Sequence, residues 1–165
     1  MSFEQLISLE LSNVLAVLAI AASPLSELRG AIPVAISAFN FPWYYALLIS
    51  VIGNLLPAVF ILVFLDTISR WLSKVRFFDQ LLKWLFERTR RQGKIIERYE
   101  RIGLALFIAI PLPVTGAWTG SVIAVLLGLK FRYAFLSIFT GVLIAGIIVT
   151  SATLLGWAVF GLLET

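Results

Sequence analysis

Two apolar segments of this chain are each broken near the middle by prolines, glycines and hydroxyl side chains. The first break reads SPLSELRGAIP, from Ser23 to Pro33, and the second break reads IPLPVTGAWTG, from Ile110 to Gly120. Non-helical backbone at membrane depth occurs only where protein or a water-filled cavity surrounds it. Because interrupted helices in the two halves of a membrane chain mark transporter sites, the pair predicts a substrate site where the two breaks meet near the bilayer midplane.

The composition excludes a soluble domain. Of the 165 residues 61% are hydrophobic and 13% charged, which is too little polar surface to cover a globular fold. Cysteine and histidine are both absent, so disulfides, zinc, haem and histidine-based catalysis are excluded. We therefore expect no enzyme, no metal and no cofactor.

Two ionisable side chains, Glu27 and Arg29, lie inside the first break. A charge at this depth costs about 2.5–3.5 kcal/mol on insertion scales, and such groups are functional by default. One reading is a buried ion pair that stabilises the break. The other gives Arg29 an anionic headgroup or a phosphate, which guanidinium binds bidentately, and makes Glu27 the proton-titrating or cation-binding group. The second reading is favoured.

Basic residues set the predicted topology. Ten of the thirteen lie between Arg70 and Arg101, which places that stretch in the cytoplasm and argues against nucleic acid as a partner. Lys130 and Arg132 extend the signal to the far side of residues 103–129. With both flanks in the cytoplasm, residues 103–129 must enter and return as a re-entrant hairpin. The acidic N-terminus lies outside, so residues 13–40 form a hairpin from the other face, unless Gln5–Ala22 spans fully.

The sequence thus predicts an all-α polytopic membrane protein with an inverted-topology repeat, each half a re-entrant helical hairpin plus a spanning helix. Residues 1–12 are expected to be a short amphipathic or loosely ordered lead-in. Lipids are expected as partners, as is a second copy of the chain, because so small a bundle buries little around a polar site. We expect a prokaryotic inner or plasma membrane. The single transmembrane domain, residues 1–165, is divided into a first hairpin (13–40), a spanning helix (45–65), a basic amphipathic cytoplasmic linker (66–102), a second hairpin (103–129) and a last spanning helix (133–160).

Several polar or helix-breaking residues complete the candidate site. Ser26 is a candidate N-cap for a helix with Glu27 in its first turn. The second break offers free backbone groups, hydroxyls and one aromatic ring, which could bind a substrate. The alternative interpretation is that it is only a helix breaker with capping residues. Asn54, in the first spanning helix, is either a ligand or a hydrogen-bond partner of a hairpin. The candidate substrate-binding or coupling residues are Ser26, Glu27, Arg29, Asn54, Pro111, Pro113, Thr115, Gly116, Trp118 and Thr119.

These motifs resemble a known family. ELRGAIP (27–33) together with PLPVTGAWTG (111–120) resembles the small multidrug export protein family. More distantly, Pro24 to Glu27 and the paired hairpins are similar to the DedA (VTT-domain) superfamily, although the second break lacks the arginine which that group carries there. The resemblance implies a small transporter, proton-linked or facilitated, of drug-like compounds or, as a lipid flippase, of polyprenyl-phosphate lipids. The alternative is a non-transporting scaffold or lipid-surface adaptor that uses the basic linker.

The topology has a direct test, because single cysteines can be placed in this cysteine-free chain. Cysteines substituted at Gln92 and at Arg132 should both react with an impermeant thiol reagent only from the cytoplasmic side. A permeant reagent that labels both variants serves as the control. Labelling of Arg132→Cys from outside, with Gln92→Cys labelled only from inside, would contradict the second hairpin.

Overall fold

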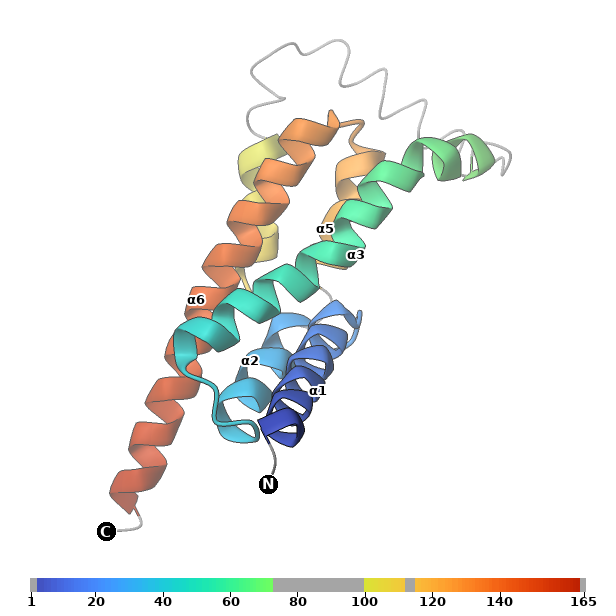
Figure 1. Cartoon of the computed structure of the whole chain (residues 1–165). Coiled ribbons are helices and arrows are strands. Elements are labelled where there is room, and N and C mark those ends of the chain that lie inside the picture. The colour runs from blue at the N-terminus through green and yellow to red at the C-terminus, as the bar shows by residue number, and fades with distance from the viewer. Residues whose placement is uncertain (1–2, 73–99, 112–114, 164–165) are drawn as a thin grey trace. The chain divides into compact units, whose positions relative to one another are not determined.

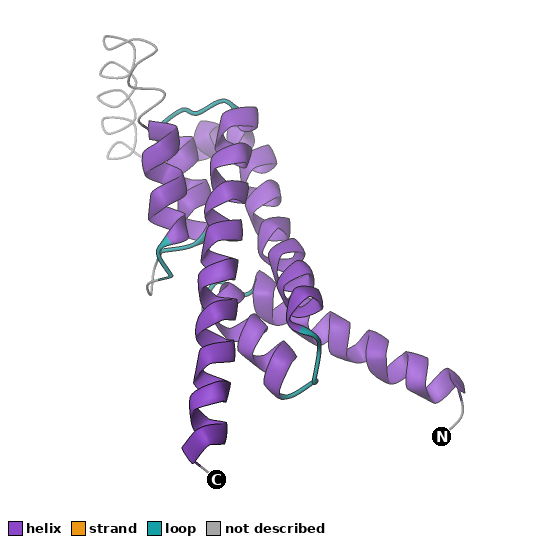
Figure 2. Cartoon of the chain, turned by 90° about the vertical axis from the view of Figure 1, so that its left-hand side faces the viewer, coloured by secondary structure: helices purple, strands orange, loops and turns teal. Residues whose placement is uncertain are grey.

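The computed structural model describes residues 3–72, 100–111 and 115–163, in which it contains helices and loops and no strand (Figures 1 and 2). The predicted all-α class is therefore confirmed for these residues. Most of the predicted linker, residues 73–99, lies outside them, as does Pro113. The helices are α1 (Phe3–Ala22), α2 (Glu27–Ser37), α3 (Trp43–Leu72), a helical segment of residues 100–109, α5 (Ala117–Leu126) and α6 (Phe131–Leu163).

Among the described residues, two helices are long and apolar enough to cross a membrane, which matches the two predicted spanning helices. They are Trp43–Phe64 of α3 and Phe131–Val159 of α6, against predicted spans of 45–65 and 133–160. The helix α5 has ten residues and covers about 15 Å at 1.5 Å per residue, half of a hydrocarbon core of about 30 Å. Re-entrant insertion of the shorter helices stays a prediction.

Two predicted boundaries differ from the structure. The helix α1 begins at Phe3, inside the predicted lead-in, and continues without a break into the apolar run. The helix α3 extends past its candidate span through residues 66–72, which were assigned to the amphipathic linker. In both cases polar residues continue an existing helix, since propagating a formed helix costs far less than nucleating a new one.

The chain divides into two compact units. The first unit contains residues 1–56 and 142–165, and the second contains residues 57–141. The first unit therefore holds α1, α2, the beginning of α3 and the end of α6. The second holds the rest of α3, the helical segment 100–109, α5 and the beginning of α6.

In the first unit, α1 and α2 pack side by side and α3 packs on both (Figure 1). Alanines dominate the core, so the helix backbones approach closely. One such close approach is at Gly53 of α3, where a Cβ atom would lie 2.8 Å from Ala21 Cβ and 2.9 Å from the Leu18 carbonyl oxygen. The fully or nearly fully buried apolar side chains of this core are Val17, Ala21, Ala31, Ala35, Ala46 and Ile49.

The turn between α2 and α3 is fixed by hydrogen bonds and aromatic contacts. Asn40 has a left-handed φ of 54°, a conformation that asparagine tolerates better than most residues. The Phe41 amide donates to the Ala35 carbonyl at 2.9 Å, and the Phe41 ring contacts Tyr45 edge-on at 5.2 Å. These contacts fix the direction in which α3 leaves the turn.

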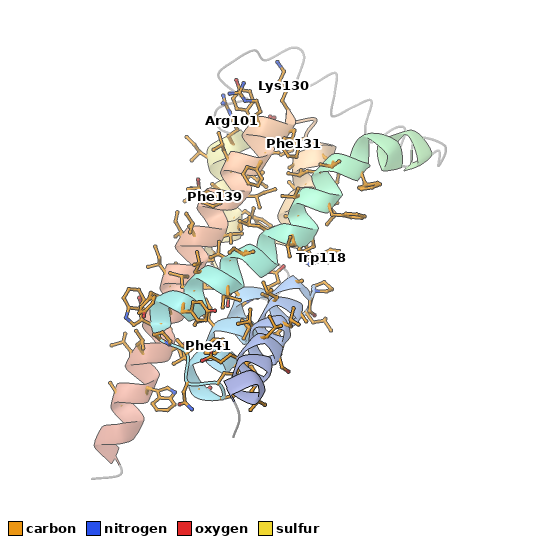
Figure 3. All side chains as sticks on the ribbon, viewed as in Figure 1. Phe41, Arg101, Trp118, Lys130, Phe131 and Phe139 are labelled. Carbon is orange, nitrogen blue, oxygen red and sulfur yellow. The ribbon has the colours of Figure 1, made fainter. Side chains whose placement is uncertain are left out.

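In the second unit, the segment 100–109 packs against α5 and α6. A Cβ atom on Gly120 would lie 2.4 Å from Ile108 Cδ1, and one on Gly141 would lie 2.7 Å from the Ala105 carbonyl oxygen. At one end of this unit Arg101 lies over the Tyr133 ring, 4.1 Å from its centroid. Figure 3 shows Arg101, Lys130 and Phe131 at that end, with Phe139 further along α6.

The two units repeat one local plan at a spacing of 88 residues. The left-handed residues Asn40 and Gly128 lie 88 residues apart, and so do the first residues of α3 and α6. Gly53 is the eleventh residue of α3, and Gly141 is the eleventh of α6. Each of these glycines seats its long helix on the helix that precedes the break of its own unit.

The glycine contact in α3 can be tested by adding a single methyl group. Gly53→Ala should lower the free energy of unfolding by about 1–3 kcal/mol, because the new Cβ meets backbone atoms that cannot move aside cheaply. The matched control is Gly156→Ala in α6, where nothing lies within 4 Å of the added atom. Thermal unfolding, followed by tryptophan fluorescence, measures both. Equal melting temperatures in the two variants would contradict the contact.

Candidate functional site

The first break begins where α1 ends. Pro24 has no amide hydrogen and restricts the residue before it, so the helix ends at Ala22. A short turn follows, in which the Ser23 amide donates to the Ile20 carbonyl at 3.2 Å and the Glu27 amide donates to the Ser23 carbonyl at 3.1 Å. The backbone thus changes direction inside an apolar unit while most of its polar groups remain hydrogen-bonded.

Ser26 occupies the N-cap position of α2, but its side chain does not cap the helix. Its hydroxyl donates instead to the Ile20 carbonyl of α1 at 2.8 Å. The predicted capping role is therefore wrong. The physical reason is that Ser26 already has a right-handed helical backbone (φ −99°, ψ −42°), whereas a capping residue has an extended one. Ser26 ties the end of α1 to the beginning of α2.

Glu27 and Arg29 form an ion pair within the first turn of α2. The Arg29 Nη2 and Glu27 Oε2 atoms are 3.6 Å apart, and both residues have further interactions. The Glu27 side chain is 7% exposed and that of Arg29 is 25% exposed. The sequence spacing of two would separate these side chains on a regular helix, so the irregular start of α2 brings them together.

Glu27 also has an unusual backbone, with φ at 47°. A left-handed conformation costs a residue with a Cβ atom roughly 1–2 kcal/mol, and such outliers gather at functional sites. The first break therefore places a buried carboxylate on a strained residue, close to a guanidinium that keeps part of its surface. This arrangement can hold an anion at Arg29, or can gain and lose a proton at Glu27.

Asn54 lies in the same unit, on α3, and is 1% exposed. Its side-chain oxygen Oδ1 has no hydrogen-bond partner among the described residues. Two further side chains of the first unit share this property, Ser50 (0% exposed) and Thr150 (5% exposed). Sequence reasoning missed both as site residues, because a hydroxyl in an apolar helix ordinarily bonds to the carbonyl four residues earlier.

The second break has its own network in the second unit. The Thr115 hydroxyl donates to the Ile110 carbonyl at 2.6 Å, across the loop that contains Pro111. The Gly116 amide donates to the Thr119 hydroxyl at 3.2 Å, which caps the beginning of α5. Gly116 itself has an extended backbone, and Trp118 is half-buried in the first turn of α5 (Figure 3). The predicted capped helix breaker is thus present, and a binding role stays a prediction.

The structure brings the predicted residues together in two groups. Ser26, Glu27 and Arg29 share one turn, and Asn54 belongs to the same unit. The residues of the second break belong to the other unit, so a site formed jointly by the two breaks stays a prediction. Within the described part of the chain, no three acidic, histidine or cysteine side chains come together as a metal site would require.

Comparison with known proteins identifies one family. The family model described as "Putative small multi-drug export protein" matches residues 27–148, which is 122 of the 165 residues and includes most of the first break and all of the second. Neither the curated proteins nor the solved structures contain a match.

Proposed function

We propose that this chain, which belongs to the small multi-drug export protein family, is a membrane transporter that exports amphipathic drug-like compounds in exchange for protons. Glu27 is the coupling group in this proposal. Family membership and the two long apolar helices support a membrane protein concerned with export, and they weigh against the scaffold and adaptor readings.

The observation that carries the proposal is the burial of the Glu27 carboxylate on a strained residue at a helix break. An apolar unit gains nothing in stability from a buried ion pair that apolar side chains of similar volume could replace. The presence of charged side chains at this break is therefore better explained by protonation and deprotonation of the Glu27 carboxylate. A carboxylate paired with a single guanidinium can release the guanidinium on protonation, which links proton uptake to rearrangement of the site.

The repeated plan of the two units supports an inverted-topology repeat. In this proposal the first and second hairpins enter from opposite faces, and their breaks meet near the midplane of a cell membrane. Thr115, Gly116, Trp118 and Thr119 then face the Glu27–Arg29 pair across the substrate, with Pro111 and Pro113 shaping the loop. A homodimer would supply the apolar contacts that so small a bundle lacks.

A second candidate substrate is a polyprenyl-phosphate lipid. The specific observation in its favour is the unequal exposure of the ion pair, 25% for the Arg29 side chain and 7% for Glu27. The guanidinium is thus the more accessible partner, and its planar fork suits a phosphate better than an ammonium does.

Replacement of Glu27 tests the proton coupling. Glu27→Gln in proteoliposomes should abolish proton-driven export of a lipophilic cationic dye, because the amide keeps the size and the hydrogen bonding but cannot titrate. The matched control is Glu10→Gln, at an exposed position of α1, which should transport normally. Undiminished proton-driven flux by monodisperse Glu27→Gln protein would leave the structural ion pair as the explanation.

Replacement of Arg29 separates the two substrates. For a phosphate lipid, Arg29→Lys should weaken binding by about one to two decades, since a charge-assisted contact contributes roughly 1.5–3 kcal/mol. Binding of a lipophilic cation should be unchanged or tighter in Arg29→Gln. Arg132→Lys, at an exposed position, is the control, and binding to protein in nanodiscs is the measurement. Equal polyprenyl-phosphate affinity in wild type, Arg29→Lys and Arg29→Gln would exclude the lipid.

A further inference from the structure

Three buried oxygens of the first unit have no hydrogen-bond partner among the described residues. They are Ser50 Oγ, Asn54 Oδ1 and Thr150 Oγ1. Native proteins pair almost all buried polar side-chain atoms with protein or with ordered water, so each exception needs a physical explanation. The Thr153 hydroxyl, on the same helix as Thr150, needs no such explanation, because it donates to the Val149 carbonyl at 2.8 Å.

The packing of α2 on α3 puts Asn54 at the level of Glu27 and Ser50 one turn away. The helix α2 runs back along α3 after a short turn, and Ala31 and Ala35 of α2 share one core cluster with Ala46 and Ile49 of α3. One turn from Ala31 toward the beginning of α2 leads to Glu27. Because α2 runs back along α3, the same step corresponds on α3 to one turn from Ile49 or Ser50 toward Asn54.

Thr150 belongs to the part of α6 that packs in the first unit. A Cβ atom on Gly146 would lie 2.7 Å from Leu47 Cδ1, 3.6 Å from Val51 Cγ2 and 3.9 Å from Leu28 Cδ1. The helix α6 therefore contacts both α3 and the first turn of α2 at Gly146. Leu28 follows Glu27 directly, and Thr150 is one turn beyond Gly146.

The positions 88 residues away show that the repeated plan of helices does not require polar side chains here. At the spacing of 88 residues, Ser50 corresponds to Ile138 and Asn54 to Val142, both 0% exposed. Thr150 corresponds to Leu62 in the same way. Apolar side chains thus occupy the equivalent positions, so the repeated plan of helices can form without these three oxygens.

We propose that Ser50, Asn54 and Thr150 bind ordered water inside the first unit, and that this water carries protons to and from Glu27. The inference rests on the proposed role of Glu27 as the coupling group. Water satisfies neutral oxygens of this kind. A bound cation would leave a net positive charge in an apolar unit, because Glu27 and Arg29 already cancel.

The charged surroundings of Glu27 are simple. Arg29 is its partner on α2. The acidic residues Glu4 and Glu10 lie in the first half of α1, and Glu10 is about 16 Å along the helix from Ala21. Tyr44 and Tyr45 are exposed at the beginning of α3, and residues 142–163 of α6 contain no titratable side chain. Ordered water at the three oxygens would carry protons between these positions and Glu27.

The test follows the protonation of Glu27 itself, without substrate or gradient. A light flash releases protons from a caged compound, and infrared spectroscopy measures the rate at which the Glu27 carboxyl absorption changes; Glu27→Gln identifies that absorption. Asn54→Val and Thr150→Val should each slow the change by about tenfold or more, the factor expected for removing one hydrogen bond from the path. Thr153→Val, one turn away with a self-satisfied hydroxyl, is the matched control and should keep the wild-type rate.

Each outcome decides the proposal. Equal rates in all variants overturn the water path while leaving Glu27 as the coupling group. A spectrum with no Glu27-dependent absorption overturns the coupling group and the water path together. The melting temperature gives a second readout, which remains usable if a valine variant folds poorly. Ser50→Ala is the variant for this readout because it is the smallest change. Removing an unpaired oxygen from a dry core raises the melting temperature and overturns the proposal, whereas removing a water ligand lowers it or leaves it unchanged. A bound cation would make the melting temperature higher in sodium than in choline, and Asn54→Val would abolish that difference. This result also overturns the water path.

Discussion

The ion pair between Glu27 and Arg29 depends on a helix break inside an apolar unit, and much of the first unit is arranged around that break. A continuous helix would place these two side chains on different faces. Pro24 ends α1, and the Ser26 hydroxyl joins the end of α1 to the beginning of α2. Alanine packing then holds both helices close to α3, so that the carboxylate is surrounded by protein on nearly all sides.

The same plan occurs in the second unit, where the sequence of the break, residues 110–120, contains no acidic or basic residue. There the break is closed by hydroxyls, with Thr115 bonded to Ile110 and Thr119 bonded to Gly116. In both units a glycine lets the long helix pack closely against the helix that precedes the break. At the spacing of 88 residues, isoleucine and valine take the positions at which Ser50 and Asn54 bring unpaired oxygens into the first unit. Our proposal assigns the proton chemistry to the first unit on the basis of this difference.

Periodicity and composition predicted the all-α class, the two spanning helices and the positions of both breaks, because each follows from residues that are close in the sequence. They gave the wrong hydrogen bond for Ser26, whose partner is six residues away on another helix. Ser50 and Thr150 could not be distinguished from Thr140 or Thr153 in the sequence. All four are hydroxyls in apolar helices, and only the packed structure shows which of them bond to their own backbone.

The left-handed backbone of Glu27 makes this position informative in other chains with the same motif. Glycine adopts a positive φ without a steric cost, so it would form this turn more easily than glutamate does. A chain with glycine here would have the turn without the carboxylate. A chain that keeps an acidic residue here accepts a conformational cost that the turn itself does not require. The residue at this single position therefore sorts relatives into those that retain the buried charge and those that retain only the fold.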